Sequence, residues 1–197
     1  MTNTANGKTV FVAGGSKGIG RAVVNALAED GYDVSFSYRS SPEEAEQLQG
    51  SLQAKYPSQQ IESHQVDLSE RAQVESFADT IATAEGLYGL VYNAGGSYDT
   101  LAALADQDKG EDLFRLNFWA LTRLAGAAAR PMMRTRSGRI ITIGSITANM
   151  GVSGNSIYAA TKGAMLSYIR TLAIELARKG VTANYVSPGY IDTDLMA

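Results

Sequence analysis

The sequence predicts an α/β protein whose central parallel sheet is doubly wound, with helices covering both faces. Short apolar runs alternate with longer segments of helical spacing along the whole chain, which is typical of parallel sheets. The first apolar run leads directly into a glycine-rich turn that opens a helix. No Pro- or Ser-rich linker and no run of like charges divides the 197 residues, so we predict a single domain over residues 1–197.

The strands are expected where Val, Ile, Phe and Tyr gather in short runs, because β-branched and aromatic side chains favour strands. In chain order the expected strands cover residues 9–13, 33–38, 60–66, 87–92, 139–144 and 181–186. The dipeptide Pro188-Gly189 breaks the last run soon after its end.

The helices are expected where apolar residues recur every three or four positions. Gly31 ends the first helix. For the second, Ser41 is the expected N-cap, Pro42 takes the first helical position and Glu44 closes a capping box. Ser69 is expected to cap the third. In chain order the expected helices cover residues 18–30, 42–55, 70–85, 113–133 and 155–179.

Composition excludes several classes of function. The net charge of -3 gives no general attraction to nucleic acid or to anionic lipid. The absence of cysteine removes thiolate nucleophiles and iron–sulfur ligation, and a single histidine, His64, makes a metal site unexpected, so we interpret His64 as structural. The polar first residues and the lack of a long apolar run predict a cytoplasmic protein without a signal peptide or membrane span.

The glycine-rich turn after the first strand predicts a phosphate-binding site. Gly14, Gly18 and Gly20 lie where the strand gives way to the helix, and the unpaired N–H groups of a helix start attract an anion such as a pyrophosphate. The spacing is G-x-x-x-G-x-G, which differs from the G-x-G-x-x-G of other dinucleotide-binding proteins. A tight turn without a ligand is the alternative interpretation.

The end of the second strand indicates which dinucleotide would bind. An acidic residue there would bind the ribose 2′-hydroxyl of NAD, but the chain reads Tyr38-Arg39-Ser40, which favours the 2′-phosphate of NADPH. Lys17 in the glycine loop adds a second cation. The alternative is that Arg39 and Lys17 are solvated surface cations.

A possible catalytic group follows the fifth strand. Tyr158 and Lys162 are four residues apart and would share one helix face. Ser145 lies 13 positions before Tyr158, just past the end of the fifth strand. The carboxyl ends of parallel strands surround the ligand crevice, so these side chains and the glycine loop are expected at one sheet edge. An ordinary surface pair on a helix is the alternative for Tyr158 and Lys162.

In combination these motifs resemble the short-chain dehydrogenase/reductase family, most closely its 3-oxoacyl-[acyl-carrier-protein] reductases. The resemblance covers the chain from Lys8 onward and rests on Gly14 to Gly20, Asp67-Leu68, Asn93-Ala94-Gly95, Ser145, Tyr158 with Lys162, and Pro188-Gly189. It implies a Rossmann fold. Two positions depart from the family pattern: Ala13 stands in place of Thr, and Tyr92 in place of the first Asn of Asn-Asn-Ala-Gly.

The resemblance also implies roles for single residues. Tyr158 would be the general acid, Ser145 would polarise the substrate carbonyl, and Asn117 would hold a water of a proton relay. Lys162 would hold the nicotinamide ribose, and a neighbouring cation is expected to lower the pKa of Tyr158. The implied cofactor-binding residues are Gly14, Ser16, Lys17, Gly18, Ile19, Gly20, Arg39, Ser40, Asp67, Leu68, Asn93, Ala94, Gly95, Tyr158, Lys162, Pro188, Gly189, Ile191 and Thr193.

The resemblance implies NADPH-dependent reduction of a ketone, with a 3-oxoacyl thioester on acyl carrier protein as the expected substrate in fatty acid biosynthesis. The alternatives are a carbonyl reductase of a polyketide-like or small free ketone, and a non-catalytic NADPH-binding module. A basic patch at the pocket mouth would favour the carrier protein. The candidates for it are Arg123, Arg130, Arg134 and Arg136, and a solvated helix face is the alternative interpretation.

The resemblance further implies a homo-oligomer, a dimer or a homotetramer, that pairs the helices around 113–129 and 164–176. The family also continues beyond the point where this sequence stops. We therefore expect that this sequence lacks a C-terminal substrate loop and a seventh strand, and a truncated, inactive protein is the alternative.

Overall fold

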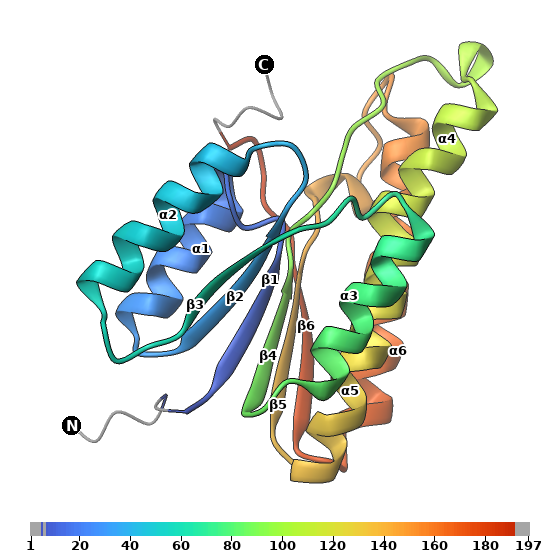
Figure 1. Cartoon of the computed structure of the whole chain (residues 1–197). Helices are drawn as coiled ribbons and strands as arrows, with labels where there is room; N and C mark the ends of the chain where they lie inside the picture. Colours follow the sequence, from blue (N-terminus) through green and yellow to red (C-terminus); the bar gives the residue numbers. More distant parts are fainter. Residues whose placement is uncertain (1–4, 6, 192–197) are drawn as a thin grey trace.

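The computed structural model describes residues 5 and 7–191 and contains a six-stranded, fully parallel sheet (Figure 1). Its strand order is β3-β2-β1-β4-β5-β6, which reverses direction between β1 and β4. The predicted doubly wound α/β fold is therefore confirmed, and the reversal marks where such sheets open a ligand crevice. The strands are β1 (Thr9–Ala13), β2 (Asp33–Tyr38), β3 (Ile61–Gln65), β4 (Leu87–Tyr92), β5 (Gly138–Ile143) and β6 (Val181–Val186).

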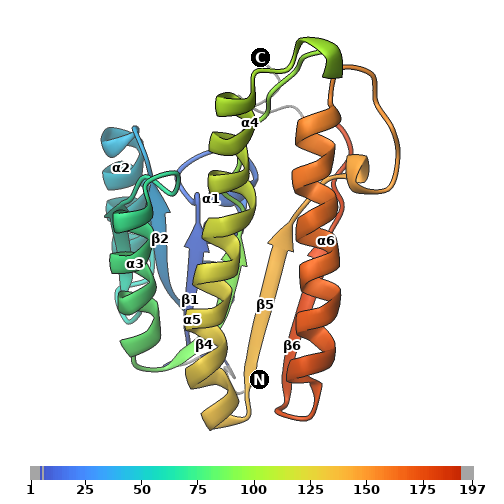
Figure 2. The same cartoon turned by 90° about the vertical axis from the view of Figure 1, so that its right-hand side faces the viewer.

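Helices cover both faces of the sheet (Figures 1 and 2). One face carries α1 (Gly18–Glu29) and α2 (Pro42–Lys55). The other carries α3 (Arg71–Thr83), α5 (Ala120–Thr135) and α6 (Ser156–Ala177), which lie side by side in Figure 2. No helix in the described part of the chain is long and apolar enough to cross a membrane.

Each face of the sheet has its own core, because successive strand residues point to opposite faces. In β1, Phe11 packs with the α3–α5–α6 layer, where Leu124 and Met165 are fully buried. Its neighbour Val12 packs on the other side with the fully buried Phe36. The loops that follow the strands are consequently held against a rigid frame, and these loops build the site.

The long helix predicted over 113–133 begins earlier and is not regular. Helix α4 (Gln107–Phe114) is capped by Asp106, whose carboxylate accepts from the Lys109 N–H at 3.2 Å. It continues through a π-helical turn, Arg115–Trp119, into α5. The prediction missed this turn because apolar spacing does not register one extra residue in a helical turn.

Of the two predicted helix caps, Ser41 stands at the N-cap position of α2 as expected but without the capping box, and Ser69 was wrong. Ser41 precedes α2 but makes no capping hydrogen bond, and Glu44 pairs with Lys17 at 3.0 Å instead of closing a capping box. The Ser69 hydroxyl donates to the Asp67 carboxylate at 2.6 Å, and Glu70 stands at the start of α3. In both places a side chain that was expected to bond at the helix end, Glu44 or Ser69, instead bonds to another segment or to its own loop.

Candidate active site

Two adjoining cavities open at the edge of the sheet where the parallel strands end. The larger has a volume of about 410 Å³ and lies over the glycine loop and the end of β2. The smaller, of about 240 Å³, lies between the end of β5 and the start of α6. Both are lined by Ile19, Asn93, Gly95 and Gly96, so they form one continuous groove across the switch point of the sheet.

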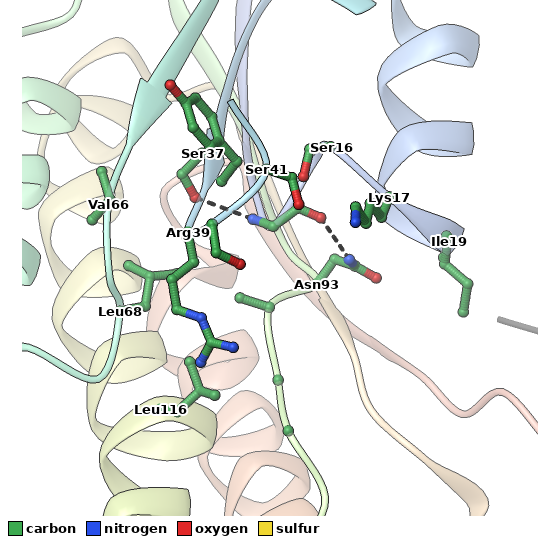
Figure 3. A pocket seen from close by; sticks show the side chains of 17 residues that line it. Ser16, Lys17, Ile19, Ser37, Arg39, Ser41, Val66, Leu68, Asn93 and Leu116 are labelled. Carbon is green, nitrogen blue, oxygen red and sulfur yellow. Dashed lines mark hydrogen bonds between the residues drawn. The ribbon is translucent and has the colours of Figure 1, made fainter. Parts of the chain in front are cut away.

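The glycine loop is fixed by its own backbone and by two side chains (Figure 3). Gly14 has φ +76°, a left-handed conformation that favours glycine. Its N–H donates to the Ser37 hydroxyl at 3.1 Å, and its carbonyl accepts from the Asn93 amide at 2.8 Å. A Cβ on Gly20 would lie 1.9 Å from that same carbonyl oxygen. The loop therefore needs glycine at both positions to bring the start of α1 to the cavity.

The larger cavity gathers most of the predicted cofactor residues. It is lined by Gly14, Ser16, Lys17, Gly18, Ile19, Arg39, Ser40, Leu68, Asn93, Ala94 and Gly95. Sequence reasoning missed the other lining residues, which are Ser37, Tyr38, Ser41, Val66, Gly96 and Leu116. Most of them adjoin a predicted residue, so a search of the flanks of each strand end would have found them.

The two predicted cations differ in their surroundings. Arg39 is exposed and extends along the cavity beside Leu68 toward Leu116 (Figure 3). Lys17 forms an ion pair with Glu44 at 3.0 Å, and that contact lowers the pKa of the Glu44 carboxyl. Arg39 is therefore the stronger candidate for a ligand phosphate in this cavity.

Asp67, a predicted cofactor-binding residue, is not among the residues that line the larger cavity. Its carboxylate accepts hydrogen bonds from the Ser69 N–H at 2.9 Å and the Ser69 hydroxyl at 2.6 Å. Burial by itself would raise the pKa of Asp67, but the Ser69 hydrogen bonds and then the charge of Arg39 lower it. Val66 and Leu68 line the cavity on either side of Asp67. A contact of Asp67 with adenine stays a prediction.

Ser145, Tyr158 and Lys162 meet in the smaller cavity. The Lys162 ammonium lies 5.5 Å from the centre of the Tyr158 ring and donates to the Ile143 carbonyl at 3.5 Å. The Ser145 hydroxyl accepts from the N–H and the hydroxyl of Thr147, at 3.2 and 2.9 Å. A phenol, a hydroxyl and a buried ammonium thus share a space open to a small ligand.

The predicted effect of Lys162 on Tyr158 was wrong for this structure. Burial raises the pKa of the Tyr158 phenol, the Ser145 side chain opposes that shift, and Asp99 adds to it. Burial also lowers the pKa of Lys162 to about 8. The ammonium lies beside the ring centre, and removal from water disfavours the charged form of each group. The phenol therefore holds its proton at neutral pH, as a proton donor must.

Asn117 lies in the π-helical turn, behind the cavities, and is fully buried. Its amide oxygen accepts from the Gly96 N–H at 2.9 Å, and its amide nitrogen donates to the Thr161 hydroxyl at 3.0 Å. A Cβ on Gly95 would lie 3.2 Å from the Asn117 oxygen and 3.5 Å from the Lys162 nitrogen. The side chain thus ties the loop after β4 to α6 beside the lysine. Its predicted water-holding role stays a prediction.

The loop after β6 supplies one wall of the smaller cavity. Pro188, Gly189 and Ile191 line it as predicted, while Thr193 lies outside the described residues. Sequence reasoning missed further residues of this cavity, among them Ser97, Asp99, Thr147, Asn155 and Tyr190. Asp99 accepts from the Asn155 amide at 2.8 Å, which joins the loop after β4 to the start of α6. No local motif marks that long-range pair.

The predicted basic patch does not lie at the mouth of the cavity. Arg123 pairs with Glu75 and Asp79 of α3. Arg130, Arg134 and Arg136 lie toward or just past the end of α5, next to the start of β5, whereas the site lies beyond the end of that strand (Figure 2). The prediction was wrong because α5 runs along the strands, away from the sheet edge where the cavities open. Its later turns therefore lie far from that edge.

Comparison with known proteins agrees with this arrangement. A family model described as short chain dehydrogenase matches residues 8–197. The 3-oxoacyl-[acyl-carrier-protein] reductase FabG of Salmonella typhimurium is 35% identical over 190 residues, which are 96% of this chain and 75% of that protein.

Two solved structures share the fold with a comparable degree of sequence identity. A short-chain dehydrogenase from Sphingobium yanoikuyae in complex with NADPH has a TM-score of 0.90 and 29% identity, covering 95% of this chain and 73% of that one. A short chain dehydrogenase from Burkholderia cenocepacia in complex with NADP has a TM-score of 0.86 and 33% identity, covering 97% and 77%. The glycine loop, the Ser145–Tyr158–Lys162 group and the family model lead to one conclusion: the chain belongs to the short-chain dehydrogenase family.

Proposed function

We propose that this chain reduces a ketone to a secondary alcohol with NADPH as the reductant. The observation that carries the proposal is the continuity of the two cavities. Arg39 lies at one end of the groove, and Ser145, Tyr158 and Lys162 lie at the other. A dinucleotide with its phosphates at the glycine loop would extend from one to the other, which brings its reactive end to the catalytic group.

The residues present fit NADP(H). The start of α1 and the glycine loop offer N–H groups for the pyrophosphate, and the exposed Arg39 suits a ribose 2′-phosphate. Asn93 and Gly95 line both cavities and would lie beneath the middle of the cofactor. The Sphingobium and Burkholderia relatives are complexes with NADPH and NADP. When bound, the cofactor supplies the hydride that reduces the carbonyl carbon.

The chain's own residues supply the proton and the orientation. Tyr158 is protonated at neutral pH and gives its proton to the carbonyl oxygen as that oxygen gains negative charge. The Ser145 hydroxyl hydrogen-bonds to the same oxygen. Lys162, whose pKa lies at about 8, exchanges protons readily near neutral pH and holds the ribose beside the phenol. One hydride and one proton are added, so the ketone leaves as an alcohol.

The preferred substrate is a 3-oxoacyl thioester on acyl carrier protein, which would place the reaction in fatty acid biosynthesis. The Salmonella relative, 35% identical, is named for that reaction. The arginines expected to hold the carrier protein lie away from the cavity, so the relatives support this substrate and the basic patch does not. A polyketide-like or small free ketone is the second candidate. We further propose a cytoplasmic homo-oligomer.

The test is oxidation of NADPH with a 3-oxoacyl thioester, presented on acyl carrier protein and as a free thioester, and with a panel of free ketones. Wild type is compared with Tyr158→Phe, which keeps the ring and removes the proton donor. We expect kcat to fall by at least about a hundredfold in the variant, which is the lower end of the range for a general acid. Equal rates would remove Tyr158 from the chemistry, and tight NADPH binding without turnover of any ketone would favour the non-catalytic module.

The same assay decides the choice of cofactor. With NADH in place of NADPH, kcat/KM should fall, and Arg39→Ala should remove most of that difference because the guanidinium would no longer pair with the 2′-phosphate. A wild type that prefers NADH would contradict the assignment of Arg39.

A further inference from the structure

A single hydroxyl connects the two segments that carry the catalytic group. Tyr185 lies in β6 and is half buried. Its phenol oxygen accepts a hydrogen bond from the Ser145 N–H at 3.0 Å. It lies 3.2 Å from the Lys162 carbonyl oxygen, to which it can donate its proton, and 3.4 Å from the Ser145 carbonyl. No motif in the sequence marks this residue.

The contact adds to the hydrogen bond between the Lys162 ammonium and the Ile143 carbonyl, which already links α6 to the end of β5. Ser145 follows β5, where Gly144 donates to the Val186 carbonyl and Ile146 to the Pro188 carbonyl. Lys162 lies in the first part of α6. The Tyr185 hydroxyl is therefore placed to set the distance between the Ser145 backbone and the helical turn that presents Lys162.

Gly144 makes room for the Tyr185 ring. A Cβ at Gly144 would lie 1.8 Å from Cζ of Tyr185 and 2.0 Å from its hydroxyl oxygen, which no packing tolerates. The tyrosine hydroxyl thus reaches Ser145 only because the preceding residue has no side chain. The two positions form a matched pair across β5 and β6.

We propose that Tyr185 is a positioning residue, which holds the Ser145 backbone and the Lys162 turn in register for the reduction. The inference rests on the proposed function, since Ser145 and Lys162 matter there as reacting partners. The hydroxyl is suited to this work because it accepts and donates at once. Its pKa is raised, chiefly by burial, so it keeps the proton that it donates to a carbonyl.

The test compares Tyr185→Phe with Tyr168→Phe as a matched control. Tyr168 is also half buried, and its hydroxyl lies 3.4 Å from the Thr122 carbonyl on α5, outside both cavities. In Y185F we expect kcat to fall about tenfold or more, since displacements of an ångström in a catalytic group have costs of this size. The dissociation constant for NADPH, measured by fluorescence, should rise by less than kcat falls, because Lys162 is only one of the residues expected to hold the cofactor, and Y168F should match wild type in both.

Amide hydrogen exchange provides a readout that does not depend on turnover. Loss of its acceptor should speed exchange at the Ser145 N–H by about tenfold in Y185F, and Y168F should leave it unchanged. Unchanged exchange at Ser145 would overturn the proposal, as would unchanged kcat in an active enzyme. If wild type reduces no ketone, the proposed function fails while the exchange result still decides the role of Tyr185.

The pair with Gly144 gives a second, independent variant. Gly144→Ala alone should lower the melting temperature sharply because its methyl group would collide with the ring. The double variant Gly144→Ala with Tyr185→Val removes the ring and the hydroxyl together, so it should recover the melting temperature while kcat stays as low as in Y185F. Recovery of both stability and kcat in the double variant would show that the hydroxyl positions nothing.

Discussion

The burial of Lys162 disfavours the positive charge that its proposed role requires. Its side chain is only 4% exposed, and removal from water lowers its pKa to about 8 from an ordinary value of 10.5. In the folded apoprotein, the ammonium at pH 7 is therefore held against a desolvation penalty. In the function that we propose, this cation would lie beside the cofactor at the expense of some stability.

The consequence is a pH dependence of stability with a definite sign. Between pH 8 and 10.5 the unfolded chain keeps the Lys162 proton while the folded chain has lost it, so wild type gains stability as the pH rises through this window. Below pH 8 the penalty is constant, on the order of 3 kcal/mol.

Lys162→Met measures that penalty, because methionine is uncharged at every pH. We expect urea unfolding of the apoprotein to show the variant more stable than wild type at pH 7, with the difference shrinking toward pH 10. A difference that stays level across this range would mean that Lys162 titrates alike in both states.

At the level of elements, the π-helical turn between α4 and α5 is what brings Asn117 to the site. The turn includes residues 115–119, and one extra residue in it breaks the regular helical hydrogen bonding. The hydroxyl of Tyr92, a fully buried residue at the end of β4, donates to the Leu116 carbonyl in this turn. The tyrosine that departs from the family pattern thus supports the segment next to Asn117.

Tyr92→Phe tests this support without leaving a cavity. The Leu116 carbonyl would lose a buried donor, so we expect a loss of unfolding free energy of about 1–3 kcal/mol and faster amide exchange over residues 115–119. Tyr88→Phe, on the same strand and half buried beside Tyr32, should change stability by no more than about 0.5 kcal/mol. Equal effects of the two variants would contradict a specific role for the Tyr92 hydroxyl.

At the scale of the whole molecule, the α3–α5–α6 layer exposes large apolar side chains. Trp119 is 61% exposed at the end of the π-helical turn, and Ile174 on α6 is 79% exposed. A groove of about 350 Å³ borders Trp119 and Ile157. Exposed apolar surface of this kind is typical of protein interfaces, which agrees with the homo-oligomer that we propose.

Ile174→Glu tests this interface, because the residue is too exposed to matter for the fold of one chain. We expect the variant to sediment as a smaller species than wild type in analytical ultracentrifugation. Its melting temperature should fall only by the amount that assembly contributes to the stability of wild type. Ala26→Glu places the same charge at an exposed apolar position of α1, on the opposite face of the sheet, and should leave the assembly intact. An identical mass for I174E and wild type would exclude this part of α6 from the interface.

Local chemistry was enough to predict most of the fold. The bounds of β1, β2, β4 and β6 agree with the predicted runs. The central strands β1 and β4 are almost wholly apolar because both of their faces are covered, whereas β2 and the edge strand β6 alternate apolar with polar residues. The glycine loop could also be predicted, because few other residues adopt the left-handed conformation of Gly14 or fit against the Gly14 carbonyl at position 20. The predicted ends of the strands then indicated which side chains lie together at the edge of the sheet where the cavities open.

The order of elements, the glycine loop and the candidate residues Ser145, Tyr158 and Lys162 therefore follow from local sequence alone. Three features instead depend on the packing of the folded chain: burial raises the pKa of Tyr158, Asp67 bonds to Ser69, and Tyr185 reaches Ser145 past Gly144. Burial and long-range contacts depend on residues that are distant in the chain, so they cannot be predicted from a local sequence pattern. Spacing predicts which face a side chain occupies, whereas solvation and hydrogen-bond partners follow from everything packed against it.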